Sequence, residues 1–239
     1  DSTAGVAEAR QAAAACGVEL VAGAEISVTW QGATIHVVAL GIDPHSETLQ
    51  QGLQKLVDFR HWRAEEIGRR LAKCGISGAY EAALALSNGA LISRTHFARY
   101  LVAQGRASDV RAVFKHYLVS GKPGHVRGEW ATLEEAVSWI VDAGGMAVIA
   151  HPARYRLTRT RLRKLLGEFK EVGGAALEVV SASHGRDEIF TMAAHARDFD
   201  LLGSAGSDFH SPDQPWTALG RLAPLPPGCI PVWRDWGSL

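Results

Sequence analysis

The spacing of apolar residues in the first part of the chain alternates as in β-strands. Two apolar, β-branched stretches, residues 19–30 and 33–42, flank Gln31-Gly32 and predict a hairpin with a two-residue turn. That register pairs Glu25 with Val38. Because side chains alternate between faces, it also places Glu25 and His36 on one face as diagonal neighbours, with backbones about 7–8 Å apart. A three-residue turn would put them on opposite faces.

The pattern becomes helical between residues 46 and 118. A long amphipathic helix over 46–74 precedes shorter ones over 80–86, 94–103 and 109–117. The Gly/Pro loop "SGKPGHV" then closes the region. We therefore predict a helical insertion subdomain over residues 45–128.

Helices and short apolar strands alternate in the remainder of the chain. Predicted helices over 132–143, 158–172 and 185–199 each precede a strand, at 146–150, 175–180 and 201–207 respectively. An Ala-rich helix is also predicted near the start, ending before Gly17. This order indicates an α/β domain, built from residues 1–44 and 129–239, with a parallel sheet or barrel and helices outside it.

Charge is distributed unevenly although its total is zero. Residues 45–128 contain 13 Lys+Arg and 6 Asp+Glu, a net charge of +7, so the remainder carries −7. The zero total argues against broad attraction of the whole chain to nucleic acid or membrane, whereas the basic insertion suits a small anionic substrate.

Compartment is predicted from the cysteines and from hydropathy. No apolar run reaches the length of a membrane helix, so no membrane association is expected. Cys16, Cys74 and Cys229 lie far apart without a CxxC pair, which is typical of a reducing cytoplasm. Nothing in the sequence indicates an obligate protein partner.

Side chains of the kinds that bind metals lie inside or at the ends of the predicted strands. Glu25, inside "LVAGAEISV", must be nearly buried and needs a cation, either a metal ion or a buried arginine. His36 and His151 are in or after apolar strands, where each is a metal ligand or a structural histidine. Asp208 and His210, at i and i+2 of an extended segment, point the same way and serve one metal cluster, or are a turn aspartate beside a surface histidine.

This set of ligands predicts a chemistry. Mixed Asp/Glu/His ligation suits two or more Mn, Fe, Zn or Mg ions, whereas the scattered cysteines exclude a thiolate site. A site with several metals that lowers the pKa of water and holds anionic oxygens is suited to hydrolysis, most naturally of phosphate esters.

Candidate substrate contacts lie in the basic region and after His151. "SRTHFARY" places Ser93, Arg94 and His96 at a helix start, where free N–H groups and an arginine hold an anion; the alternative is an ordinary helix cap with a solvated arginine. Lys122 is in the Gly/Pro loop and is otherwise a surface lysine. Arg154, with the tyrosine that follows it, is placed to meet a substrate over the metals.

Seven segments together carry a resemblance to a known family. "GAEISV", "IHVVALGID", "ISRTHFAR", "GKPGHV", "AVIAHPARY", "LEVVSASH" and "GSDFH" resemble the PHP (polymerase and histidinol phosphatase) superfamily of metal-dependent phosphoesterases. The similarity is greatest to the branch that removes the 3′-phosphate from nucleoside 3′,5′-bisphosphates such as pAp and that degrades short RNA from the 5′ end. It implies a distorted (β/α)7 barrel in which a helical insertion covers the active site.

The resemblance also implies roles for the candidate residues. It implies two or three divalent ions, with Mn²⁺ as the preferred metal. Glu25 would bridge two of these ions, and His36 and His151 would complete the ligands of one of them. Asp208 and His210 would bind the other ions. Catalysis would use Glu25, Asp208 and His184, with a metal-bridging hydroxide attacking the phosphorus. The residues implied to bind the nucleotide and its phosphates are Ser93, Arg94, His96, Lys122 and Arg154, while His184 binds it too or assists the leaving group. The implied partners are therefore a small anionic nucleotide and short RNA.

The start of the chain departs from the family pattern. Members begin with a strand bearing His-x-His, and Asp1 matches the last residue of a later "TDHD" motif, so we expect that the sequence begins inside the domain, without its first two strands. The chain as printed is then expected to bind metal poorly and to hydrolyse little. Two alternatives stay open: another PHP phosphatase, such as a histidinol-phosphate enzyme, and a non-catalytic nucleotide-binding module if the chain is natively this short.

Overall fold

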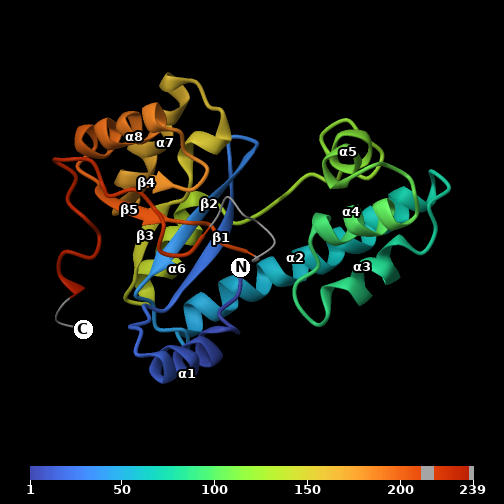
Figure 1. Cartoon of the computed structure of the whole chain (residues 1–239), viewed down its shortest axis with the longest axis horizontal. Helices are drawn as coiled ribbons and strands as arrows, with labels where there is room; N and C mark the ends of the chain where they lie inside the picture. The colour runs from blue at the N-terminus through green and yellow to red at the C-terminus, as the bar shows by residue number, and fades with distance from the viewer. Residues whose placement is uncertain (211–217, 237–239) are drawn as a thin grey trace. The chain divides into compact units, whose positions relative to one another are not determined.

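The chain divides into two compact units in the computed structural model, which describes residues 1–210 and 218–236 (Figure 1). Unit 1 comprises Asp1–Leu53 and Ala131–Leu239, and unit 2 comprises Gln54–Trp130. Helix α2, Glu47–Ala72, begins in unit 1 and continues in unit 2. The helical unit therefore starts inside this helix rather than before it.

A five-stranded mixed sheet in the order β1-β2-β3-β4-β5 forms the centre of unit 1. Strands β1 and β2 are antiparallel, as are β2 and β3, whereas β3, β4 and β5 are parallel. The predicted parallel α/β arrangement thus describes the second half of the sheet, and the hairpin adds the antiparallel half. The strands are β1 Gly23–Trp30, β2 Ala33–Leu40, β3 Met146–Ile149, β4 Ala176–Ser181 and β5 Leu202–Gly206.

The β1–β2 hairpin has the predicted register. Gln31 and Gly32 form the turn with φ of 46° and 77°, the positive values that a two-residue hairpin turn requires at both positions. Glu25 pairs with Val38, and Ser27 pairs with His36. Since side chains alternate along each strand, Glu25 and His36 share one face, as expected.

Helices pack on this sheet through their apolar sides. Helix α6 contacts β1, β2 and β3, while α8 contacts β4 and β5 (Figure 1). In α6 the buried residues Ala136, Val137 and Ile140 recur at helical spacing and meet the sheet. The helical elements of unit 1 are α1 Val6–Cys16, the start of α2, the 3₁₀ turn η2 Pro152–Tyr155, and the helices α6 Leu133–Asp142, α7 Arg159–Glu171 and α8 Arg186–Asp198.

Unit 2 is helical and has a hydrophobic core of its own. Its elements after α2 are α3 Ala79–Ser87, α4 Arg94–Ala103, α5 Val110–Val113 and the π-helix η1 Phe114–Leu118. Phe97 and Leu101 are fully buried there together with Leu71 and Leu118. No strand is present within residues 54–130, and no helix in the described part of the chain is both long enough and apolar enough to cross a membrane.

The helix predicted over 109–117 is shorter and changes type. Asp109 caps its start, because a carboxylate oxygen accepts the Ala112 N–H at 2.8 Å. After Val113 the chain widens into the π-turn, in which the Val119 N–H bonds to the Phe114 carbonyl at 3.0 Å. Spacing of apolar residues alone does not distinguish these two helix types over so short a segment.

Gly52 permits the close approach of α2 and α6 in unit 1, because a Cβ there would lie 2.3 Å from the Trp139 ring. We expect Gly52→Ala to lower the free energy of unfolding by about 1–3 kcal/mol through overpacking. Gly167 of α7 is the matched control, since a Cβ there meets Phe199 only at 3.7 Å. Gly167→Ala should raise stability by about 0.5–1 kcal/mol through helix propensity. Urea unfolding followed by circular dichroism measures both, and shifts of the same sign would contradict the assignment.

Candidate metal centre and arginine pocket

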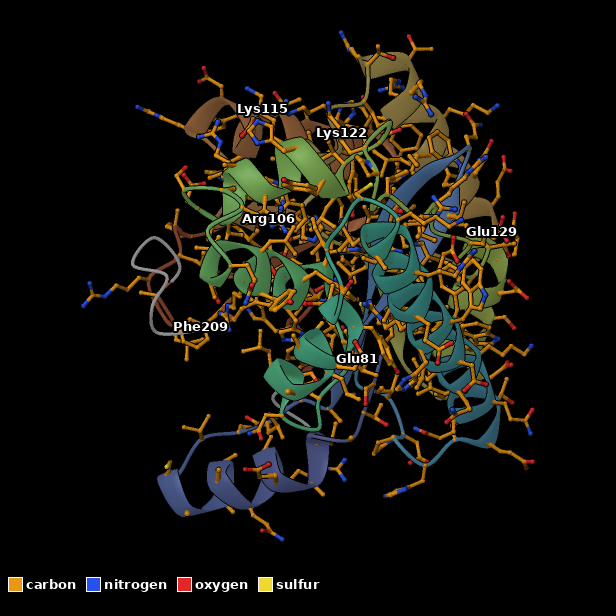
Figure 2. All side chains as sticks on the ribbon, turned by 90° about the vertical axis from the view of Figure 1, so that its right-hand side faces the viewer. Glu81, Arg106, Lys115, Lys122, Glu129 and Phe209 are labelled. Atoms are coloured by element: carbon orange, nitrogen blue, oxygen red, sulfur yellow. The ribbon has the colours of Figure 1, made fainter. Side chains whose placement is uncertain are left out.

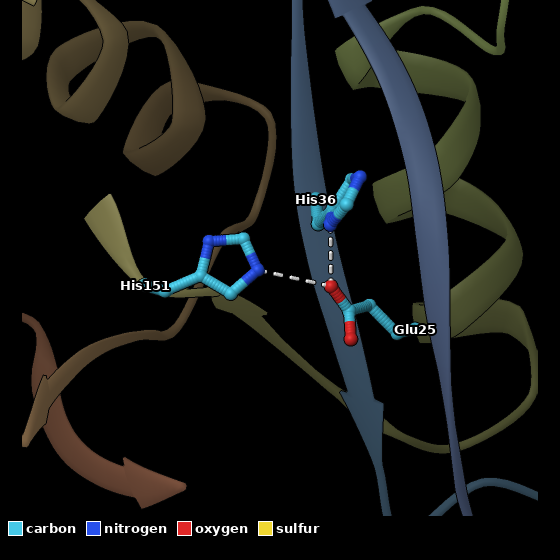
Figure 3. Close-up of side chains that lie close together, drawn as sticks. All are labelled: Glu25, His36 and His151. Atoms are coloured by element: carbon cyan, nitrogen blue, oxygen red, sulfur yellow. Dashed lines mark hydrogen bonds and ion pairs between the residues drawn. The ribbon is translucent and has the colours of Figure 1, made fainter. Parts of the chain in front are cut away.

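Three side chains from three strand segments meet at one carboxylate oxygen (Figure 3). Nδ1 of His36 lies 2.5 Å from Oε1 of Glu25, and Nε2 of His151 lies 3.1 Å from the same atom. The two imidazole rings are edge to face, with centroids 5.2 Å apart. Glu25, His36 and His151 are the group within the described ranges whose donor atoms could hold a metal ion.

Electrostatics keep the Glu25 carboxyl ionised. Burial raises its pKa, but the hydrogen bonds and charges of His151 and His36 outweigh this effect and leave the pKa well below its usual value. An anionic carboxylate oxygen beside two imidazole groups is a donor set that suits a divalent cation.

The donor set fits a divalent metal. Nδ1 of His36 is buried against the Glu25 carboxylate at 2.5 Å, and Nδ1 of His151 is buried without a hydrogen-bond partner among the described residues. Two imidazoles and a carboxylate suit Mn, Fe or Zn. The site can therefore bind an ion that carries further ligands.

His151 is held in a strained backbone conformation. Its φ is 29°, in the left-handed region that a non-glycine residue seldom adopts. The Glu178 carboxylate accepts the His151 N–H at 2.5 Å, and Nε2 of His184 accepts the Ala153 N–H at 3.4 Å. Both side chains thus fix the loop that carries the ligand.

These two supporting residues are buried on β4 and just after it. Burial raises the pKa of Glu178 to about 7, although the hydrogen bond from the His151 N–H lowers this pKa in part. Burial lowers the pKa of His184, whose Nδ1 lies 3.1 Å from the Val179 carbonyl. Both ring nitrogens of His184 are therefore engaged with backbone groups, an arrangement that positions the loop.

Tyr155 links the middle of β2 to the residue that follows β3. Its hydroxyl accepts the His36 N–H at 2.8 Å and donates to the Ala150 carbonyl at 2.7 Å. Burial raises the pKa of the phenol, so it remains a neutral donor. Its ring also contacts His151, with centroids 5.5 Å apart.

Asp208 and His210 follow β5 but do not join the Glu25 cluster. Asp208 has a φ of 51°, so the expectation of an extended segment is wrong at this point. A left-handed residue redirects the chain, and Nδ1 of His210 turns back to the Asp208 carbonyl at 2.8 Å. The Asp208 carboxylate instead pairs with Arg154 at 2.5 Å.

Unit 2 contains a separate pocket lined by three arginines. Arg60 and Arg63 from α2 meet Arg94 and Ser93 at the start of α4, above an apolar floor that includes Phe97. Burial lowers the pKa of Arg63 to about 10, and the positive charges of Arg94 and Arg60 contribute to this decrease. Burial and the Arg60 charge also lower the pKa of Arg94.

Aromatic rings fix these guanidinium groups. Arg60 and Arg63 lie over the Trp130 ring at 4.9 and 5.2 Å, and Arg94 lies over Phe114 at 5.5 Å. Like charges held together at a concave surface suit an anion with more than one charge. Arg60 and Arg63 were not predicted from sequence, although their i, i+3 spacing in "RHWR" was the available signal.

His96 and Lys122 have different surroundings. Nδ1 of His96 accepts the Ser93 N–H at 3.1 Å, so this side chain caps the helix start. Burial lowers the pKa of His96, with the Arg99 charge adding to it. Lys122 is exposed in the loop after η1, where the structure shows no contact of its side chain that would mark a site (Figure 2).

Two relatives of this chain are named as a phosphatase and an exoribonuclease. No family model matches the chain. The 3′,5′-nucleoside bisphosphate phosphatase of Chromobacterium violaceum is 47% identical over 98% of the chain and 83% of its own length. The 5′-3′ exoribonuclease Rnm of Escherichia coli strain K12 is 42% identical, over 99% of the chain and 81% of that protein.

Solved structures agree with this grouping. An amidohydrolase of Chromobacterium violaceum with bound sulfate has a TM-score of 0.92 at 46% identity, over 99% of this chain and 83% of that one. A candidate metal-dependent phosphoesterase of Bifidobacterium adolescentis has a TM-score of 0.79 at 26% identity, over 92% of this chain and 78% of that one.

The fold and the Glu–His–His cluster thus define a phosphoesterase of the PHP superfamily, a class of hydrolases that act on phosphate esters. Within that class, the chain belongs to the family of the 3′,5′-nucleoside bisphosphate phosphatases and the Rnm exoribonucleases.

The Tyr155 hydroxyl bonds provide a test of the supporting network. Tyr155→Phe keeps the ring but removes the hydroxyl that connects β2 to the end of β3. We therefore expect the Mn²⁺ affinity to fall about tenfold, which is the usual effect of removing a hydrogen bond that orients a metal ligand. Tyr100→Phe, which removes a hydroxyl bonded to the Ser77 carbonyl at 3.0 Å in unit 2, is the control. Isothermal titration with Mn²⁺ measures both, and equal affinities for Tyr155→Phe and the control would show that the hydroxyl is not needed.

Proposed function

We propose that this protein hydrolyses the 3′-phosphate of nucleoside 3′,5′-bisphosphates such as pAp and shortens RNA from its 5′ end. The observation that carries the proposal is the Glu25 carboxylate with two imidazoles converging on one oxygen. Its relatives are named for these two activities, which favours them over a histidinol-phosphate activity. Both reactions are hydrolyses of a phosphate ester, so one site serves both.

We propose that two or three divalent ions bind at this site, with Mn²⁺ as the preferred metal. Glu25, His36 and His151 would hold one of them, and Asp208 and His210 are the proposed ligands of the others. Such ions, when bound, neutralise phosphate oxygens and lower the pKa of water. Use of Asp208 as a ligand requires exchange of its ion pair with Arg154, which the substrate phosphate can then engage.

The chain's own cations are proposed to bind the phosphate groups. The Arg60, Arg63 and Arg94 guanidinium groups, already stacked on aromatic rings, would take a phosphate at little cost in side-chain entropy. Ser93, His96, Lys122 and Arg154 complete the proposed nucleotide-binding set. His184 is proposed to act by holding the His151 loop, since both of its nitrogens are occupied.

We further propose the distorted (β/α)7 barrel as the fold of unit 1, with the helical insertion covering the active site. A cytoplasmic location is also proposed. It is supported by three free cysteines, Cys16, Cys74 and Cys229.

The function is tested with Glu25→Gln in the full-length gene product. We expect Mn²⁺-dependent phosphate release from pAp by the wild type and a loss of at least about 100-fold in kcat/KM in the variant, because the metal-binding charge is removed. Glu19→Gln, at an exposed position before β1, is the control and should match the wild type. Absence of phosphate release by the wild type, or full activity of Glu25→Gln, would refute the proposal.

The arginine pocket is tested separately with Arg94→Gln. Loss of one charge-assisted phosphate contact should raise the KM for pAp about tenfold or more, with a smaller change in kcat. Arg99→Gln, on the exposed side of the same helix, should leave both constants within about twofold. If Arg94→Gln and Arg99→Gln have the same KM, the pocket does not bind this substrate.

A further inference from the structure

Unit 1 has a concentrated run of positive charge that the ligands of the candidate metal centre do not explain. The basic strip, defined as residues 154–164, contains Arg154, Arg156, Arg159, Arg161, Arg163 and Lys164. No acidic residue occurs between Asp142 and Glu168. Unit 1 as a whole has 12 Lys+Arg and 19 Asp+Glu, so half of its basic residues fall within eleven positions of an otherwise acidic unit.

The strip begins at the candidate metal centre and extends away from it. Arg154 pairs with Asp208, and the next residue hydrogen-bonds to the His36 backbone. Farther along, the Arg161 guanidinium lies 5.6 Å from the Trp30 ring. Trp30 pairs with Ala33, three residues from His36, which places it roughly 10 Å along the sheet from that histidine.

Packing and ion pairs do not account for the exposed arginines of the strip. Arg163 pairs with Asp198 at 2.5 Å and Lys164 with Glu168 at 3.6 Å. Arg156, Arg159 and Arg161 are exposed and form no direct ion pair with a carboxylate within residues 1–210 and 218–236, although the Arg159 charge helps to lower the pKa of Asp198. Their guanidinium groups are thus accessible to a ligand.

Arg159 and Arg161 also do not stabilise helix α7, in whose first turn they lie. Cations in the first turn oppose the helix dipole and weaken the helix. Helix α7 has no acidic residue in its first turn, whereas α6 begins with Glu134 and Glu135 and α8 with Asp187 and Glu188. A residue choice that weakens the local helix is expected where a binding function requires it.

We propose that the basic strip binds the phosphodiester backbone of a single-stranded oligoribonucleotide whose reacting end lies at the candidate metal centre. This inference rests on the proposed function and deepens it by naming the surface that holds the RNA strand beyond its reacting end. Guanidinium groups spaced along a surface match the regular phosphates of a strand, and such contacts carry no base specificity.

The test uses Arg156→Gln/Arg159→Gln/Arg161→Gln in the full-length protein. We expect its Kd for a 5′-phosphorylated ten-nucleotide RNA, measured by fluorescence anisotropy in EDTA to prevent cleavage, to rise about tenfold or more. The slope of log K against log [salt] should become less steep by about 2, since each lost contact to a single strand contributes about 0.7. With Mn²⁺, its kcat and KM for pAp should stay within about twofold of the wild type.

A matched triple variant controls for the loss of net charge. Arg10→Gln/Arg186→Gln/Arg221→Gln removes three exposed arginines of unit 1 that lie outside the strip, and its RNA affinity should stay within about twofold of the wild type. Thermal unfolding of both variants confirms that they are folded. Vesicles of anionic phosphatidylserine provide a second polyanion.

Four outcomes would overturn the proposal. The first is that the wild type shows no measurable binding of RNA, and the second is that both triple variants lose RNA affinity equally. The third is that the KM for pAp of the strip variant rises in parallel with its Kd for RNA. The fourth is that binding of vesicles depends on the strip whereas binding of RNA does not. Failure of the proposed function looks different. Wild-type protein would then bind RNA through the strip but release no phosphate from pAp.

Discussion

The Glu25 carboxylate, which is half-buried rather than nearly buried as expected and is paired with the imidazoles of His36 and His151, determines how unit 1 must be assembled. A carboxylate in a largely apolar strand is expensive to bury unless it has partners, and here the two partners come from β2 and from the residue that follows β3. A slip of one residue in the β1–β2 register would turn Glu25 to the opposite face and leave it unpaired. The antiparallel half of the sheet and the candidate metal centre therefore depend on the same alignment.

The hairpin and its contribution to the site could be predicted because both follow from local rules. A two-residue turn fixes the register, and the two-residue period of strands fixes which side chains share a face. His151 was found from its place after an apolar strand. These are arguments about one or two neighbouring elements, and the sequence contains all the information they need.

The parts that sequence did not reveal act through the backbone of distant residues. Glu178 and His184 hold the loop of His151 and Ala153 from about 30 positions away, and neither contact has a signature in residue spacing. The left-handed φ of Asp208 likewise has no marker in "GSDFH", so the extended reading of that segment was wrong. Arg60 and Arg63 read as the solvated side of an amphipathic helix until the fold brings Arg94 beside them.

The two groups of arginines differ in the physics of binding. In the pocket of unit 2, burial and mutual repulsion lower the pKa of Arg63 and Arg94, so an anion that enters relieves repulsion between groups already held in place. The arginines of the basic strip are solvated, and each exposed contact contributes little by itself. A desolvated pocket gains most from a single compact phosphate, whereas a solvated row gains only by summing contacts along a chain. We therefore propose the first arrangement for a nucleotide and the second for an oligonucleotide, and relatives of the chain are named as a nucleoside bisphosphate phosphatase and an exoribonuclease.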